Sequence, residues 1–191
     1  ISSTTASMNF PTTGGAYANV LNGNQDAVVC KLNNNLSSLL WSTYFGGIGD
    51  ESGNSIEISP NGNIYSAGGS TSPNFPGVSV GNDLGNNGGL SDGYVARFNP
   101  SNGGVISATF MGANEYDQTY FVRCDPSNQV YVYGQTESNW VISPNCVGTP
   151  NSGQYIRKYD GNLSNIQWST VFGAGSGHVE ISPTAFLVSD C

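Results

Sequence analysis

The sequence feature that most constrains the fold is an internal repeat. The phrase WSTYFG at residues 41–46 recurs as SATFMG at 107–112 and as WSTVFG at 168–173. Other segments recur at the same or nearly the same spacing: DAVVCKLN at 26–33, SIEISPNGNIYSAGG at 55–69 and MNFP at 8–11. A chain that repeats its own segments in this way is built from copies of one supersecondary unit.

Each unit contains four short strand patterns and no helical period. We name them strand a (55–59), strand b (63–69), strand c (93–99) and strand d (39–46). Turn-rich sequences such as PNGN join strands a and b as tight hairpins. Four antiparallel strands in a unit of about 60 residues predict an all-β fold built of β-propeller blades. A β-solenoid would need much shorter coils, and an immunoglobulin-like sandwich would not repeat its own sequence.

The phase of the repeat predicts how the blades divide the chain. We expect two whole blades at 49–112 and 113–174, flanked by two half-blades. The first half-blade, within 1–48, would begin after a strand b and hold strands c and d at about 26–46. The last, within 175–191, would hold strands a and b at about 178–190. Because propellers typically need 4–8 blades, we expect a piece of a longer chain, or two copies that complete each other's half-blades.

Composition excludes several classes of partner. Only 9% of the residues are charged, against about 25% in an average globular protein. Five basic residues in total argue against nucleic acid and against anionic membranes, since both need clustered Lys and Arg. No run of about 18 apolar residues is present to span a bilayer. The aromatic content, with 10 Tyr, 8 Phe and 3 Trp, indicates a chain that folds.

The repeated phrases resemble the beta-propeller repeat family of bacterial secreted and cell-surface proteins. The matching segments are NFPTTGGAY, DAVVCKLN, WSTYFGGIGDESGNSIEISPNGNIYSAGG, NFPG and DGYVARFNP. The segments MGANEYDQ and CVGTPNSGQYIRKY depart from the pattern, and their blades are placed by register. The resemblance implies a closed propeller on a secreted or cell-surface protein, and it implies no enzymatic activity.

The repeat also separates architectural residues from sites, because a residue that recurs in every blade serves the blade. Lys31, Arg97 and Lys158 share one slot, which we interpret as a repeated structural contact rather than a track for an anionic ligand. Trp41 and Trp168 share another slot. We interpret these indoles as packing between blades rather than as platforms for sugars.

Two features break the symmetry and are candidate binding residues. Glu57, Arg123 and Glu180 occupy one slot of strand a, conventionally the innermost strand; they form either a structural network or an anion contact in the central channel. Trp140, in the loop from strand b to strand c, has no counterpart in the other blades as we align them. It is either an exposed binding anchor or a cover for the blade.

Metal, disulfide and catalytic patterns are weak. The acids of the loop before strand a are Asp50, Glu51, Glu115 and Asp117. They are interpreted as solvated turn residues, with calcium binding as the alternative.

The four cysteines show no C-x-x-C spacing. Cys30 and Cys124 are expected in the core, while Cys146 and Cys191 could pair. The sole histidine, His178, has no nearby nucleophile motif, so no catalytic residue is assigned.

These observations favour a non-enzymatic extracellular binding or scaffold module with no cofactor. Its expected partners are further propeller blades, from the same longer chain or from another copy, and another surface protein or a glycan. The alternatives are a carbohydrate-active propeller enzyme that uses carboxylates around the channel, and a purely structural subunit of a surface assembly. Glu57 and Glu180 share a slot and so look architectural, which disfavours the enzyme.

Overall fold

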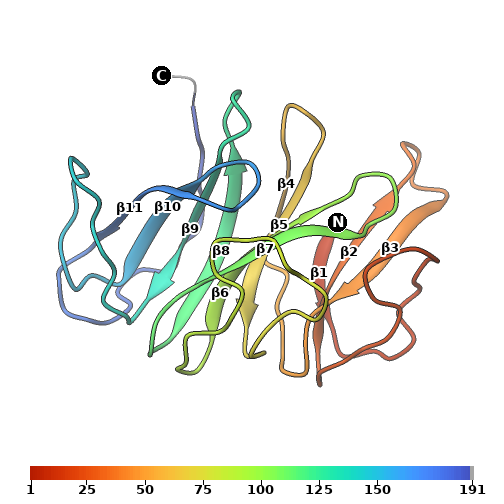
Figure 1. Cartoon of the computed structure of the whole chain (residues 1–191), viewed down its shortest axis with the longest axis horizontal. Helices are drawn as coiled ribbons and strands as arrows, with labels where there is room; N and C mark the ends of the chain where they lie inside the picture. Colours follow the sequence, from red (N-terminus) through yellow and green to blue (C-terminus); the bar gives the residue numbers. More distant parts are fainter. Residues whose placement is uncertain (190–191) are drawn as a thin grey trace.

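The computed structural model of the chain describes residues 1–189. Within these residues, eleven strands form three antiparallel sheets, which stand side by side (Figure 1). The described residues contain no helix, and therefore none that could cross a membrane. The all-β fold predicted from the repeat is confirmed.

The second and third sheets are four-stranded blades, as the sequence predicts. The second has the order β4 (Ser55–Ile58), β5 (Ile64–Ser70), β6 (Asp92–Phe98) and β7 (Val105–Met111). The third has the order β8 (Asp117–Cys124), β9 (Val130–Thr136), β10 (Gln154–Tyr159) and β11 (Ile166–Phe172). Each strand pairs with its neighbour in sequence, and these strands are a, b, c and d of the repeat. We call the three sheets the first, second and third blade.

The first blade differs from the prediction. It holds β2 (Asp26–Leu32) and β3 (Leu39–Phe45), the expected strands c and d, but also β1 (Ser2–Thr5). Strand β1 pairs antiparallel with β2, with Ser2 opposite Val29. The expectation that the described chain begins after a strand b is therefore wrong, because β1 occupies the strand b position beside β2.

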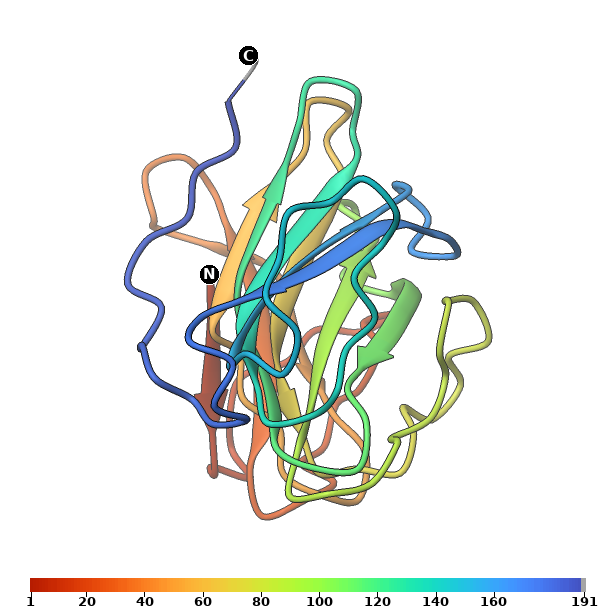
Figure 2. The same ribbon diagram turned by 90° about the vertical axis from the view of Figure 1, so that its left-hand side faces the viewer.

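The predicted hairpin at 178–190 is also wrong within the described residues, since no strand is assigned between 173 and 189. The segment instead runs outside the sheets in Figure 2, and it is tied to the third blade. The side chains of Gln135 and Gln154 both donate to the backbone oxygen of Ile181, at 2.7 and 2.6 Å. Without a strand c beside it, and with a shortened turn, the segment has no ladder to join. Residue 190 lies outside the described residues.

Two apolar cores fill the spaces between neighbouring blades. The first lies between the first and second blades and is rich in aromatic rings, including Phe45, Tyr94 and Phe98. Phe75 and Phe110 stack there with ring centroids 4.4 Å apart. The second core lies between the second and third blades. It includes Tyr65, Val95, Val132, Tyr155 and Tyr159. Because the second blade has a core on both faces, every residue of β5 is buried.

Candidate functional site

The first and second blades are joined at the loop between β6 and β7. Two donors from the first blade, Trp41 Nε1 and Lys31 Nζ, each lie 3.0 Å from the backbone oxygen of Pro100 in that loop. The loop lies directly against the indole, because a Cβ at Gly103 would stand 2.5 Å from the Trp41 ring. Gly103 has a φ of +75°, which also favours glycine. Trp41 is thereby only 2% exposed.

The second and third blades are joined at the same position of the next loop. The hydroxyl of Tyr65 donates to the backbone oxygen of Gly161, at 2.8 Å. Gly161 occupies the position of Pro100 in the loop between β10 and β11. Arg97 reaches into the same loop and donates to Asn162 Oδ1 at 2.7 Å. At both junctions a loop carbonyl thus accepts a side-chain donor from the preceding blade, and we call this the loop-carbonyl contact.

The third blade carries the same slots with different partners. Lys158 pairs with Asp125, with Nζ 3.6 Å from Oδ2, and lies 4.8 Å from the centroid of the Tyr131 ring. Trp168 is half-buried and meets Tyr131 edge to face at 5.9 Å. Phe186, in the C-terminal segment, contacts Tyr133 on the same side of the sheet at 5.5 Å. The aromatic and basic residues of this side form what we call the third-blade face: Tyr131, Tyr133, Lys158, Trp168 and Phe172.

The strand a slot brings together only two of its three predicted members. Arg123 and Glu57 form an ion pair with 3.5 Å between Nη1 and Oε2. Burial raises the pKa of Glu57, while Arg123 opposes that shift. Glu180 lies elsewhere and accepts hydrogen bonds from the backbone of Ala174 at 2.8 Å and from the hydroxyl of Ser176. The three-member network is therefore wrong.

Glu51, one of the predicted turn acids, is fully buried rather than solvated. Its carboxylate accepts hydrogen bonds from the backbone of Gly47 at 2.9 Å and from the hydroxyls of Ser70 and Ser72 at 2.6 Å each. Burial raises the pKa of Glu51, and these hydrogen bonds oppose the shift. The carboxylate closes the loop before β4.

Asp117 repeats this arrangement 66 residues later. It is also fully buried. It accepts from the backbone of Ala113 at 2.9 Å, from Ser138 Oγ at 2.8 Å and from Trp140 Nε1 at 3.1 Å. The carboxylate is thus hydrogen-bonded within the fold. Across residues 1–189, no three His, Cys, Asp or Glu side chains gather in a group that could hold a metal.

A second carboxylate stands beside each of these two. A Cβ at Gly46 would lie 2.0 Å from Glu51 Oε2 and 3.0 Å from Asp26 Oδ1, and one at Gly112 would lie 2.8 Å from Asp117 Oδ2 and 2.3 Å from Asp92 Oδ1. The glycines therefore leave the space that each acid pair occupies. Burial raises the pKa of Asp92 to about 7, with Asp117 adding to the shift.

Trp140 contradicts the prediction of an exposed anchor, since it is 8% exposed. Its ring stacks on Tyr155 with centroids 4.0 Å apart. It does have counterparts: Phe10, Phe75 and Trp140 are spaced by 65 residues in MNFP, PNFP and SNWV. Phe75 contacts Tyr94 edge to face, whereas Trp140 stacks on the corresponding Tyr155. The 65-residue spacing could have identified this slot. We did not recognise it because tryptophan replaces phenylalanine there and valine replaces the proline that follows.

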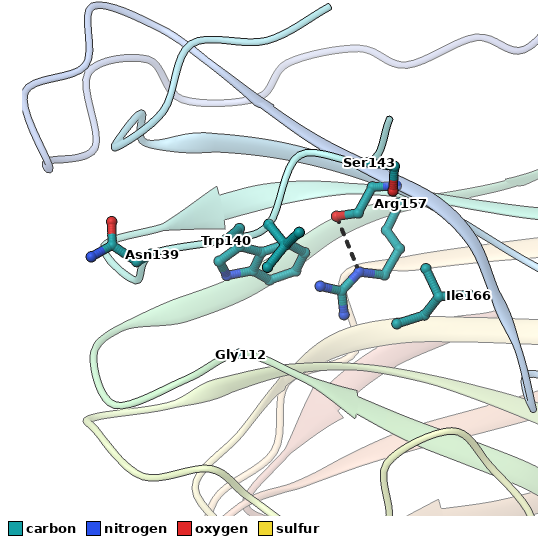
Figure 3. Close-up of a pocket in the computed structure, with 8 residues that line it drawn as sticks. Gly112, Asn139, Trp140, Ser143, Arg157 and Ile166 are labelled. Carbon is teal, nitrogen blue, oxygen red and sulfur yellow. Dashed lines mark hydrogen bonds between the residues drawn. The ribbon is translucent and has the colours of Figure 1, made fainter. Parts of the chain in front are cut away.

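The other face of Trp140 is covered by Arg157, whose guanidinium carbon lies 3.9 Å from the ring centroid (Figure 3). A cavity of about 350 Å³ opens beside them. Its lining includes Asn139, Ser143 and Ser169. Sequence reasoning placed Arg157 in a strand slot and did not identify it as a site residue.

The remaining predicted residues do not form a site. The ring of His178 is exposed, and its Nδ1 lies 4.0 Å from Glu137 Oε1. Cys30 and Cys124 are half-buried, and burial raises the pKa of the Cys124 thiol to about 12. Cys191 lies outside the described residues, so its pairing with Cys146 stays a prediction.

Comparison with known proteins bears on the repeat itself. Residues 40–76 match the model of the beta-propeller repeat family known as SBBP. This segment contains β3 except its first residue, the hairpin of β4 and β5, and Phe75. A search among curated proteins found no match. The matched segment is thus similar to the beta-propeller repeat, and the four-stranded antiparallel blades of the structure agree with that likeness.

Proposed function

We propose that the chain is a non-enzymatic, extracellular binding and scaffold module whose third-blade face receives a further propeller blade. The loop-carbonyl contact carries this proposal, because it occurs at both junctions within the chain. The donors are Lys31 and Trp41 at the first junction and Tyr65 at the second. The third blade presents Lys158, Trp168 and Tyr131 in those slots.

The chemistry of the third-blade face supports the same partner. Among the described residues, Trp168 Nε1 has no hydrogen-bond acceptor, whereas Trp41 Nε1 has Pro100. An incoming blade of the same repeat would offer a loop carbonyl at that place. It would also cover the half-buried rings of Tyr133 and Phe172 more fully, and each would contribute part of the about 1.5–3 kcal/mol that complete burial of an exposed ring provides. The blade would come from the same longer chain or from a second copy.

The absence of enzymatic activity is part of this proposal. Its support is that the carboxylates in question have structural partners: Glu57 is paired with Arg123, and Glu51 and Asp117 close buried loops. The extracellular setting is supported by the composition, which is low in charge and rich in Asn, Ser, Thr and Gly. Turnover of a polysaccharide that is lost in Glu57→Gln would contradict the non-enzymatic role.

Sedimentation of residues 1–191 over a range of concentrations tests the docking. We expect reversible association, which Trp168→Glu weakens by placing a charge in the third-blade face. The control is Leu90→Glu, because Leu90 is 79% exposed in the loop between β5 and β6. Docking between copies at this face would be refuted by a chain that stays monomeric at every concentration, or by a Trp168→Glu variant that associates as well as the parent.

A further inference from the structure

Comparing the three blades at one set of slots isolates a single charged cavity. In the second blade, Phe75, Ala96 and Ala108 belong to the first apolar core and Val78 packs against it. The corresponding residues of the third blade are Ser143, Arg157 and Ser169 beside Trp140. In the first blade the slots hold neutral residues: Phe10, Thr13, Cys30 and Ser42.

The backbone confirms that these slots correspond. Ser169 donates its backbone N–H to Ser143 Oγ at 2.9 Å, and Ser42 donates its backbone N–H to Thr13 Oγ1 at 3.0 Å. The loop from strand b to strand c therefore lies over strand d in the same way in the first and third blades. The first and third blades thus differ in side chain at matched positions, whereas in the second blade the backbone N–H of Ala108 donates to Val80 O at 2.9 Å. Compared with the apolar residues of the second blade, the lining of the third blade is polar and contains a cation.

Arg157 is the unusual member of this lining. Of the five basic residues, Arg123 and Lys158 form ion pairs, and Lys31 and Arg97 bond to the next blade. Arg157 has no carboxylate within ion-pair distance among the described residues. Its Nε donates to Ser169 Oγ at 3.4 Å and its Nη1 to Tyr159 Oη at 3.3 Å. The cation thus has hydroxyl acceptors and no counter-ion.

The stack on Trp140 fixes the direction of the guanidinium. Trp140 is held on its other face by Tyr155 and at its edge by the bond to Asp117. The guanidinium therefore lies against a rigid ring, with the cavity beside it and Ile166 across the cavity (Figure 3). A planar cation with free N–H groups, held in place in this way, matches the two oxygens of a carboxylate.

The rest of the cavity suits a hydroxylated ring. Its volume of about 350 Å³ is at the lower end of small-molecule sites. The Ser143 and Ser169 hydroxyls and the Asn139 amide offer both donors and acceptors, while Ile166 and Val141 offer apolar contacts for ring C–H groups. We propose that this cavity binds one carboxylate-bearing sugar unit, a hexuronate, with its carboxylate on Arg157.

This inference is independent of blade docking, because the cavity is lined by residues at 112, 139–143, 157, 166 and 169, away from the third-blade face. The test is a titration of ¹⁵N-labelled protein with galacturonate, followed by NMR. We expect saturable shifts of the Arg157 Nε–H signal and of the Ser143 and Ser169 amides. Glucose, which lacks the carboxylate, should bind at least about tenfold more weakly.

Variants separate the site from general effects. Arg157→Ala restores the residue of the second blade and should lower galacturonate affinity about tenfold or more. Arg157→Lys retains the charge without the planar fork and should retain part of the affinity, which guards against a folding defect in the alanine variant. Arg97→Gln is the matched control, since Arg97 bonds only to the asparagines of its own and the next blade, and it should leave the affinity unchanged.

Three results would overturn the proposal. The first is no saturable binding of galacturonate to the unmodified chain, and the second is equal binding of glucose. The third is an Arg157→Ala variant that folds and binds as the parent does. Glutamate tests the source of the carboxylate: binding as tight as that of galacturonate would refute the assignment of a sugar.

Discussion

Replacing Trp41 and Trp168 by alanine in separate variants measures what the loop-carbonyl contact contributes to stability. The two residues occupy the same slot of strand d in the first and third blades. Trp41 is 2% exposed beneath the loop that holds Pro100 and Gly103, whereas Trp168 is half-buried and has no such loop over it. The pair is therefore an internal comparison of one side chain with and without a following blade.

The structure sets the expected magnitudes. Trp41→Ala removes a fully packed indole, which costs about 3–5 kcal/mol, and this range includes the lost bond to Pro100. The carbonyl of Pro100 is not left without a partner, because Lys31 also donates to it. Trp168→Ala removes an edge-to-face contact with Tyr131, worth about 0.5–1.5 kcal/mol, together with a partly buried surface. We therefore expect a difference of at least about 2 kcal/mol between the variants.

Urea unfolding followed by far-ultraviolet circular dichroism measures this difference without relying on tryptophan fluorescence. With an m-value of about 2 kcal/mol/M, the midpoint of Trp41→Ala should lie about 1 M below that of Trp168→Ala. Trp41→Phe keeps most of the packing and should lose much less. Trp41→Phe replaces Trp41→Ala in the comparison if the alanine variant does not fold. Equal midpoints for the two alanine variants at low protein concentration would refute the reasoning.

Two further predictions concern the buried acids. Folding raises the pKa of Asp92 from 3.8 to about 7, so the folded state binds this proton more tightly than the unfolded chain does, and its contribution to stability is lost as the pH rises from about 4 to about 7. Asp92→Asn should therefore raise the urea midpoint more at about pH 8 than at about pH 5; an equal change at both would contradict the shift. Gly46→Ala places a Cβ 2.0 Å from Glu51 Oε2 and should lower the free energy of unfolding by about 1–3 kcal/mol. Gly14→Ala is its control in the same unfolding assay, because a Cβ there meets nothing within 4 Å, and equal losses would show that the acid pair does not fill the space.

The repeat alone predicted the blades because each strand is marked by a phrase that recurs at a fixed spacing. The predicted strand b at 63–69 corresponds to β5, observed at Ile64–Ser70. Strand β1 was missed because its sequence, SSTT, has no alternation of apolar and polar residues. The C-terminal hairpin was overpredicted for the opposite reason. The sequence of this segment has the residue pattern of two strands. Strand formation also depends on a neighbouring strand, which the pattern does not describe.

The candidate site was harder to predict than the fold. One strand slot holds Cys30, Ala96 and Arg157 in the three blades. Because these side chains differ in charge and polarity, the alignment identifies the position without suggesting a function for it. The stacking of Arg157 on Trp140 depends on the path of an irregular loop. That path cannot be predicted from the periodicity of the sequence. The buried state of Glu51 was missed because an acid in a glycine-rich turn is ordinarily solvated. Here it is stabilised by three donors: one from the loop before β4, one from the end of β5 and one from the loop after β5.

The loop-carbonyl contact has a consequence for how such chains change in evolution. Its acceptor, at Pro100 in one loop and Gly161 in the next, belongs to the main chain and is the same whichever residue stands there. A duplicated or deleted blade therefore meets its new neighbour without a matching substitution in the loop. Gain and loss of whole blades by recombination needs no coordinated second mutation at this contact, and individual blades are left free to diverge at positions such as Arg157.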